Sequence, residues 1–179
     1  FFIISDFVSK VNPSDARDFI AKNIFPYMVK NEMPPHWVNM DWGDVRYLVE
    51  KGHTIGGHTR SHAKVSSITD YVSLKNEIVD SATEIEAKID GSLEHFAFTF
   101  GTIDSFSSDA LAVALGKYGW IHSGFRGFNK SSNENYLVRR DSVSPDMDFD
   151  ELDFYLDGFS DNYYKNDINT CLSWNNDPL

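Results

Sequence analysis

Hydrophobic residues along this chain fall into short apolar runs separated by longer stretches with helical spacing. Most of the short runs are apolar throughout, which is typical of strands buried on both faces of a sheet. The longer stretches place apolar side chains three and four positions apart, which predicts amphipathic helices. The strands are predicted at residues 1–4, 53–56, 95–100, 120–123 and 136–143.

Residues that favour helix boundaries separate several of the predicted helices from their neighbours. Asp41 and Ser107 are good N-caps, and Gly52 suits the position just after a helix. Pro26 should break or kink the first helix. The helices are predicted at residues 16–30, 42–51, 73–89, 108–117 and 148–156, and residues 124–135 and 160–179 are predicted to be polar and irregular.

The alternation of strand and helix with short connectors predicts an α/β fold with a mostly parallel sheet. We expect residues 1–179 to form a single domain, because no linker, internal repeat or low-complexity tract interrupts the pattern. The apolar residues 1–4 read as a buried strand already under way, so the sequence is expected to be a fragment of a larger domain. Ligand sites of parallel sheets gather at the C-terminal ends of strands, and His58 and His62 follow such an end.

Composition and charge argue against several classes of partner. Hydrophobic residues make up 41% and aromatic residues 15% of the 179, so a sizeable core is expected. The net charge is −11 and no basic cluster occurs, which disfavours nucleic acids and anionic membranes. No apolar run approaches the roughly 18–20 residues of a transmembrane helix. The single cysteine, Cys171, cannot form an intrachain disulfide and is expected to be a packed thiol.

Candidate chemistry is densest in residues 51–65, K-G-H-T-I-G-G-H-T-R-S-H-A-K-V, which hold three of the six histidines. His58 and His62 are four positions apart, and on a helical turn this spacing puts both imidazoles on one face, close enough to share a metal ion. The alternative is a histidine pair satisfied by hydrogen bonds, and the spacing alone leaves both open. His53 falls on the preceding predicted strand and is interpreted as structural, or as support for the ligands.

Other motifs narrow the reaction classes. No G-x-S-x-G elbow, P-loop or G-x-G-x-x-G loop occurs, so serine nucleophiles and nucleotide chemistry have no support. The remaining histidines are scattered along the chain and are interpreted as structural: His36, His95 and His122.

The segment G-H-T-I-G-G-H-T-R-S-H-A-K-V-S-S-I resembles the second motif of the polysaccharide deacetylases, carbohydrate esterase family 4. That motif combines a "G-H-x-I-G" strand with two histidines separated by a few small or polar residues. Other parts are similar in order and spacing. Residues 1–4 resemble the family's "A-T-F-F" strand, residues 95–101 (H-F-A-F-T-F-G) its "F-A-Y-P-F-G" motif, and residues 137–140 (L-V-R-R) its "L-P-R-I" strand.

The resemblance implies a distorted or incomplete (β/α)7-type barrel of mostly parallel strands that uses a divalent metal, zinc above all. It implies that His58 and His62 are metal ligands and that His53 supports them. It also implies that the backbone N–H of Phe100 serves an oxyanion hole.

Further site residues follow from the same resemblance. Thr99 and Gly101 flank Phe100 in the third motif and are expected to contact substrate. One of Arg139 and Arg140 should point inward to orient a carboxylate, and Arg139 fits the register better.

Several family features have no counterpart in this sequence. The "T-F-D-D-G" motif, which carries the catalytic base and a third metal ligand, precedes the strand at which this sequence begins. No "L-x-H" motif with the catalytic acid follows His122. Thr99 stands where the third motif has proline, and Ala97 where many members have arginine. We expect truncation at both ends, and expect the 179 residues alone to be inactive.

The resemblance implies a metal-dependent deacetylase that removes N-acetyl groups from amino sugars of a cell-surface polysaccharide or its precursor, as in cell envelope polysaccharide biosynthesis. Its partner would be an N-acetylated carbohydrate. One alternative is a non-catalytic glycan-binding relative with the same fold, and another is an unrelated α/β domain whose histidines only pack. The free Cys171 and the lack of disulfides favour a cytoplasmic over a secreted location.

Overall fold

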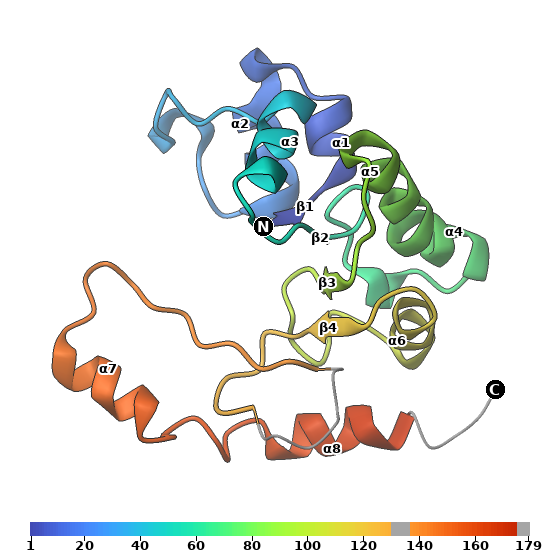
Figure 1. The fold of residues 1–179 in the computed structure, drawn as a ribbon. Helices are drawn as coiled ribbons and strands as arrows, with labels where there is room; N and C mark the ends of the chain where they lie inside the picture. Colours follow the sequence, from blue (N-terminus) through green and yellow to red (C-terminus); the bar gives the residue numbers. More distant parts are fainter. Residues whose placement is uncertain (130–136, 175–179) are drawn as a thin grey trace.

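The computed structural model describes residues 1–129 and 137–174 and contains one parallel sheet (Figure 1). Its order is β1-β2-β3-β4, and each strand pairs in parallel with the next. An isolated parallel bridge between His122 and Val138 continues the sheet beyond β4. The strands are β1 (Phe2–Ile3), β2 (Gly56–Gly57), β3 (His95–Ala97) and β4 (Trp120–His122).

This topology confirms the predicted parallel α/β fold. Neighbouring strands are consecutive in the sequence, so every connection crosses over through helices. The arrangement is that of part of a (β/α) barrel, and the described strands form an open row with β1 and β4 at opposite ends. The strands are shorter than predicted. Only Val138 of the predicted strand 136–143 pairs with the sheet, and Tyr136 lies outside the described residues.

Helices fill the connections between the strands, and Figure 1 shows α4, α5 and α6 along one side of the sheet. The helices are α1 (Ser5–Ser9), α2 (Ala16–Phe19), α3 (Trp42–Glu50), α4 (Tyr71–Lys75), α5 (Ser81–Ile89), α6 (Ser108–Leu115), α7 (Phe149–Leu156) and α8 (Lys165–Trp174). Two π-helical turns, η2 (Ile20–Ile24) and η5 (Asn76–Asp80), follow α2 and α4, and 3-10 turns lie at η1 (Pro13–Asp15), η3 (Lys30–Glu32) and η4 (Val65–Ser67).

Local capping sets several of these boundaries as predicted. Asp41 accepts a hydrogen bond from the Asp44 N–H at 3.0 Å, and the Asp41 N–H donates to the Asp44 carboxylate at 2.9 Å, which forms a capping box at α3. The Ser107 side chain caps α6 by accepting a hydrogen bond from the Ala110 N–H. The predicted helix 73–89 begins earlier, at Tyr71, because the Asp70 carboxylate accepts from the Ser73 N–H.

Three features of the helices differ from the predicted ranges. The first helix ends at Ile24 instead of residue 30, which confirms the break predicted at Pro26. The short helix α1 was not predicted. Residues 165–174 were expected to be irregular but form α8, which buries Cys171 and packs Trp174 edge-on against Phe106. The predicted irregular loop 124–135 is described only to residue 129.

The two faces of the sheet differ because side chains alternate along a strand. Ile3, Phe96 and Ile121 point toward the helices and are fully buried in the hydrophobic core. The opposite face carries Phe2, Gly56 and His122. The Phe2 ring lies across Gly56, where an added Cβ would come within 2.7 Å of two Phe2 ring carbons, and it contacts the His122 ring with centroids 5.0 Å apart. This second face leads up to the ends of the strands, where the candidate site lies.

Candidate active site

The candidate site lies at the C-terminal ends of β2 and β3, where the segments that follow these strands approach each other. His58 follows β2 directly, and its N–H donates to the Ile3 carbonyl at 3.0 Å, which continues the pairing with β1. The His58 and His62 rings lie edge to face with centroids 5.1 Å apart, and the His62 and Phe100 rings do the same at 5.1 Å. The structure therefore brings together three of the residues predicted from the sequence.

The two histidines are paired by a loop and not by the predicted helical turn. Residues 58–62 are not helical, and Thr59 and His62 have left-handed φ values of 62° and 64°. Such values are uncommon for residues other than glycine, and they fold the loop back so that His62 returns toward His58. The structure confirms that the two rings lie close together, as the spacing predicted, but the helical turn that the argument assumed was wrong.

Hydrogen bonds fix the tautomers of both rings. His58 Nδ1 lies 2.7 Å from the Ala97 carbonyl oxygen, and His62 Nδ1 lies 2.7 Å from the carbonyl oxygen of Asn23 at the end of η2. A carbonyl only accepts, so Nδ1 carries the proton in each ring and the neutral ring keeps a lone pair on Nε2. Metal-binding histidines commonly have this arrangement. The two interpretations left open by the sequence, hydrogen-bonded pair and metal ligands, are therefore compatible.

The electrostatics of the site also keep these imidazoles neutral. Burial, with smaller effects of His62 and Arg140, lowers the pKa of His58 to about 4, and the hydrogen bond to the Ala97 carbonyl opposes this shift in part. Burial likewise lowers the pKa of His62. Both rings are therefore unprotonated near neutral pH, the state that a metal ion requires.

The described residues supply two such ligands and no complete cage. Within residues 1–129 and 137–174, no three His, Cys, Asp or Glu side chains form a group that could hold a metal ion. A catalytic zinc site takes three protein ligands. The histidine pair fits the zinc predicted from the sequence as a partial ligand set.

Phe100 has the geometry expected of an oxyanion donor. Its φ is 63°, and the Gly101 N–H donates to the Thr99 carbonyl at 2.7 Å, so Phe100 is the central residue of a tight three-residue turn. The Phe100 N–H finds no acceptor within the described part of the chain. This turn leaves an unpaired amide beside the His62 ring, and the role of Phe100 stays a prediction.

The flanking residues Thr99 and Gly101 build the turn and are both buried, and their contact with substrate stays a prediction. Thr99 is 0% exposed, and its hydroxyl donates to the Ala63 carbonyl. Gly101 is buried, has a φ of 73° and accepts from the Gly124 N–H at 2.8 Å. A Cβ on Gly101 would lie 2.4 Å from the Gly124 nitrogen, which explains why glycine is needed there.

Arg140, and not Arg139, points toward the site. The Arg139 guanidinium donates to the carbonyls of Phe128 and Asp161, at 3.2 and 2.9 Å. It therefore links the segments that contain these two residues. Arg140 donates through Nε to the Ser123 carbonyl at 3.0 Å and lies over the Phe2 ring, 5.4 Å from its centroid. The register argument that favoured Arg139 was wrong, because the segment joins the sheet only through a bridge at Val138.

His53 lies at the opposite end of β2. It precedes that strand, is exposed, and its ring meets the edge of Phe1 with centroids 5.2 Å apart. No contact between His53 and either of the two paired histidines occurs among the described residues. The expectation that it supports the ligands does not fit this placement.

A second histidine pair was missed by the sequence analysis. His95 Nδ1 and His122 Nε2 lie 3.0 Å apart, and the Phe2 ring contacts both His122 and His58. Burial lowers the pKa of His122 to about 4, followed by the charges of Arg140 and His95. The available signal was that both residues belong to consecutive predicted strands, which are neighbours in most parallel sheets.

Acid should destabilise the protein because of these buried imidazoles. A histidine in the unfolded chain titrates near 6.5, whereas the pKa values of His58 and His122 are about 4 in the fold. The unfolded state therefore binds more protons between these values, and the free energy of unfolding should fall as the pH drops from about 6.5 to about 4, by up to about 3 kcal/mol for each histidine. Urea unfolding across this range tests the trend.

The variants sharpen this test. His58→Gln should remove part of the pH dependence, whereas replacement of the exposed His53 should leave it unchanged. A free energy of unfolding that stays constant between about pH 7 and about pH 4.5 would contradict the assignment.

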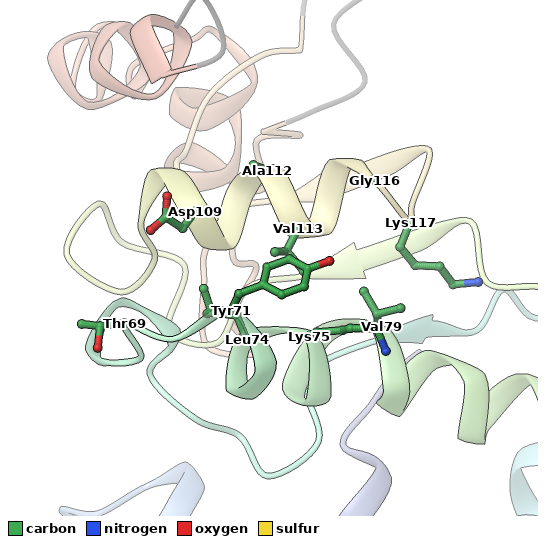
Figure 2. A pocket seen from close by; sticks show the side chains of 10 residues that line it. All are labelled: Thr69, Tyr71, Leu74, Lys75, Val79, Asp109, Ala112, Val113, Gly116 and Lys117. Atoms are coloured by element: carbon green, nitrogen blue, oxygen red, sulfur yellow. The ribbon is translucent and has the colours of Figure 1, made fainter. Parts of the chain in front are cut away.

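One of the surface grooves in the described part of the chain adjoins the candidate site. A groove of about 630 Å³ is lined by Gly124, Arg126, Arg140 and Tyr155 among others. A second groove, of about 530 Å³, lies between α4 and α6 and contains no histidine (Figure 2). In that view the Tyr71 ring lies over a floor that includes Leu74 and Val113. The second groove is therefore not part of the histidine site.

Comparisons with known proteins identify the family of this chain. The profile described as polysaccharide deacetylase matches residues 15–118, which is more than half of the sequence. The chain belongs to the polysaccharide deacetylase family. Members of this family act on N-acetylated carbohydrates and generally use a divalent metal. The resemblance inferred from the sequence motifs is confirmed. No protein of curated function matched the sequence.

Three solved structures share the fold. A polysaccharide deacetylase from Bacillus cereus is 16% identical over 66% of this chain and 37% of its own, with a TM-score of 0.57. A related structure from Bacillus anthracis is 16% identical over 68% of this chain and 37% of its own, with a TM-score of 0.55. A de-N-acetylase from Aggregatibacter actinomycetemcomitans is 14% identical over 87% of this chain and 63% of its own, with a TM-score of 0.60.

These identities establish likeness of fold, and the chain spans only part of each neighbour. It covers little more than a third of the Bacillus structures and less than two thirds of the third one. Of the helices described here, none has the length and apolarity needed to cross a membrane.

Proposed function

We propose that this chain carries the histidine and oxyanion parts of a metal-dependent deacetylase that removes N-acetyl groups from the amino sugars of a cell-surface polysaccharide or its precursor. The observation that carries the proposal is the pairing of His58 and His62. Both donate Nδ1–H to backbone carbonyls, both are neutral, and the His62 ring contacts the ring of Phe100. Family membership supports the reaction class.

His58 and His62 would hold a divalent ion, zinc above all, through their Nε2 atoms. When bound, such an ion supplies a Lewis acid that polarises a carbonyl and a source of nucleophilic water. The carbonyls of Ala97 and Asn23 keep the ligand nitrogens unprotonated and fix the orientation of the rings. The ligand set needs a further group, which this proposal does not assign.

The Phe100 N–H would donate a hydrogen bond to the acetyl oxygen as negative charge develops on it during attack on the amide. A preorganised backbone donor of this kind stabilises the transition state more than the ground state. The turn built by Thr99 and Gly101 holds this amide in place, with the Thr99 hydroxyl bonded to the Ala63 carbonyl.

Arg140 would provide a fixed positive charge in the same site. Its guanidinium lies beside the two histidine pairs and is held by the Ser123 carbonyl and the Phe2 ring. A fixed positive charge there favours an ionised carboxylate as its neighbour. The groove lined by Gly124, Arg126 and Tyr155 adjoins Arg140 and has the volume to receive sugar units next to the reacting one.

A non-catalytic glycan-binding relative is the second candidate. One observation favours it: the described residues contain no third ligand for the metal. Such a protein would bind N-acetylated oligosaccharide and release no acetate.

Acetate release decides between these candidates. The full-length protein that contains this chain is incubated with oligomers of N-acetylglucosamine and added zinc, and acetate is quantified with and without a chelator. The enzyme proposal expects acetate that disappears with the chelator and in a His58→Ala variant. Oligosaccharide binding without acetate, over several divalent metals, would favour the binding protein. The proposal for the metal site itself is tested separately by zinc content.

A further inference from the structure

The loop that pairs the two histidines depends on an acidic side chain far from it in the sequence. Between His58 and His62 the chain reads T-R-S, and the left-handed residues at positions 59 and 62 make this an unfavourable conformation for an isolated chain. Something in the fold must hold the loop in this shape. Glu77, in the π-helical turn η5, makes the contacts that can do so.

The Glu77 carboxylate accepts three hydrogen bonds from the loop. Its Oε2 accepts from the backbone N–H groups of Arg60 and Ser61, each at 3.0 Å. Its Oε1 accepts from the Ser61 hydroxyl at 2.9 Å. Two consecutive backbone N–H groups that converge on one anion form a strong binding arrangement, and bonds to an ionised acceptor are stronger than neutral ones.

Arg60 is held on its other sides as well. Its guanidinium donates to Glu84 at 2.9 Å and lies 3.6 Å from Asp6, and its carbonyl accepts from the Asp6 N–H at 2.9 Å. These contacts attach the Arg60 side chain and carbonyl to α5 and α1. The amides of Arg60 and Ser61, however, bond to Glu77. Glu77 is thus the side chain that binds the two backbone amides in the middle of the loop.

We propose that Glu77 is a positioning residue for the histidine pair: by clamping the two amides between the histidines, it holds both imidazoles in the orientation that shares one divalent ion. The inference rests on the proposed metal site and adds to it a residue that touches neither metal nor substrate. Glu77 acts through the backbone of the loop. Its loss should therefore weaken metal binding more than it weakens the fold.

The chain offers a matched control on the same run of helix. Glu86 in α5 also accepts from a backbone amide, that of Leu93 at 2.9 Å, and pairs with Lys117 at 2.7 Å. Its contacts lie on elements other than the histidine loop. A Glu86→Ala variant therefore removes the same kind of interaction elsewhere in the fold.

Cobalt(II) affinity, followed by the visible absorption of the bound ion, is the first readout. Glu77→Ala should lower the affinity by about 10- to 100-fold, as outer partners of metal ligands commonly do. Glu77→Gln should stay within a few-fold of the parent, because its amide oxygen can still accept from both backbone groups and its NH₂ can donate to the Ser61 hydroxyl. Glu86→Ala should keep the parent's affinity even where its thermal midpoint falls as far as that of Glu77→Ala.

Amide hydrogen exchange of the metal-free chain is the second readout. The amides of Arg60 and Ser61 should lose protection in Glu77→Ala and keep it in Glu86→Ala. Equal cobalt affinity in Glu77→Ala and the parent would overturn the proposal, as would equal losses in the Glu77 and Glu86 variants. If Glu77→Ala does not fold, an undiminished affinity in Glu77→Gln supports the proposal and a loss of tenfold or more overturns it.

The same measurements distinguish a failure of the positioning role from a failure of the proposed function on which it rests. If the parent chain binds no cobalt, the metal site is contradicted and with it the positioning role. Metal binding that depends on Glu77, without any acetate release, would support the positioning role and contradict the enzyme proposal.

Discussion

Replacing His58 with alanine is expected to lower the affinity of the chain for zinc by more than about 100-fold. Loss of an outer partner of a ligand already costs about 10–100-fold, and His58 is proposed to be a ligand itself. The expectation rests on the Nδ1 bond to Ala97, which leaves the His58 lone pair on Nε2, and on the neighbouring His62 ring. Competition with a zinc-binding dye measures the affinity, and His62→Ala should have a similar effect.

His53→Ala is the control for this prediction. His53 lies in the same histidine-rich stretch but at the opposite end of β2, where it contacts Phe1. Its removal should leave the zinc affinity unchanged. Equal losses in the His53 and His58 variants would indicate diffuse binding by histidines, and would contradict a site at the paired rings.

Replacing Phe98 with alanine is expected to lower the free energy of unfolding by about 3–5 kcal/mol. Phe98 is 1% exposed and stacks on Phe106 with ring centroids 4.3 Å apart, and it meets the edge of Phe96 at 5.1 Å. The loss combines transfer of the ring, its aromatic contacts and the cavity that remains. Chemical denaturation followed by circular dichroism measures it.

Phe149 provides the comparison for Phe98. It begins α7 and is 83% exposed, so Phe149→Ala should change the free energy of unfolding by less than about 0.5 kcal/mol. A Phe98→Ala variant as stable as Phe149→Ala would mean that the stacked aromatic residues are not the core of the domain.

The parts of the fold that depend on local chemistry were predictable from the sequence. Asp41 and Ser107 cap α3 and α6 as expected, and the buried residues of β3 were recognised from their apolar run. The helix α8 was missed because its sequence is mostly polar. Its stability comes from contacts of Cys171 and Trp174 with distant parts of the chain, which local periodicity does not reveal.

The candidate site was likewise predictable only in part. His58, His62 and Phe100 were selected from motif and spacing, because these residues follow the strands β2 and β3. Motif and spacing could not predict the hydrogen bond of Thr99 or the direction of the Arg140 side chain. Both depend on how loops that follow different strands contact each other. The clamp by Glu77 likewise joins residues 16 and 17 positions apart.

The central claim is that His58 and His62 together hold a divalent ion through their Nε2 atoms. A crystal structure of the chain grown with zinc, with the metal located by its anomalous scattering at the zinc absorption edge, tests this claim most directly. The account predicts one strong peak within about 2.0–2.1 Å of both Nε2 atoms, with the Nδ1 bonds to Ala97 and Asn23 retained. Zinc bound elsewhere, or no peak between the two rings, would contradict it.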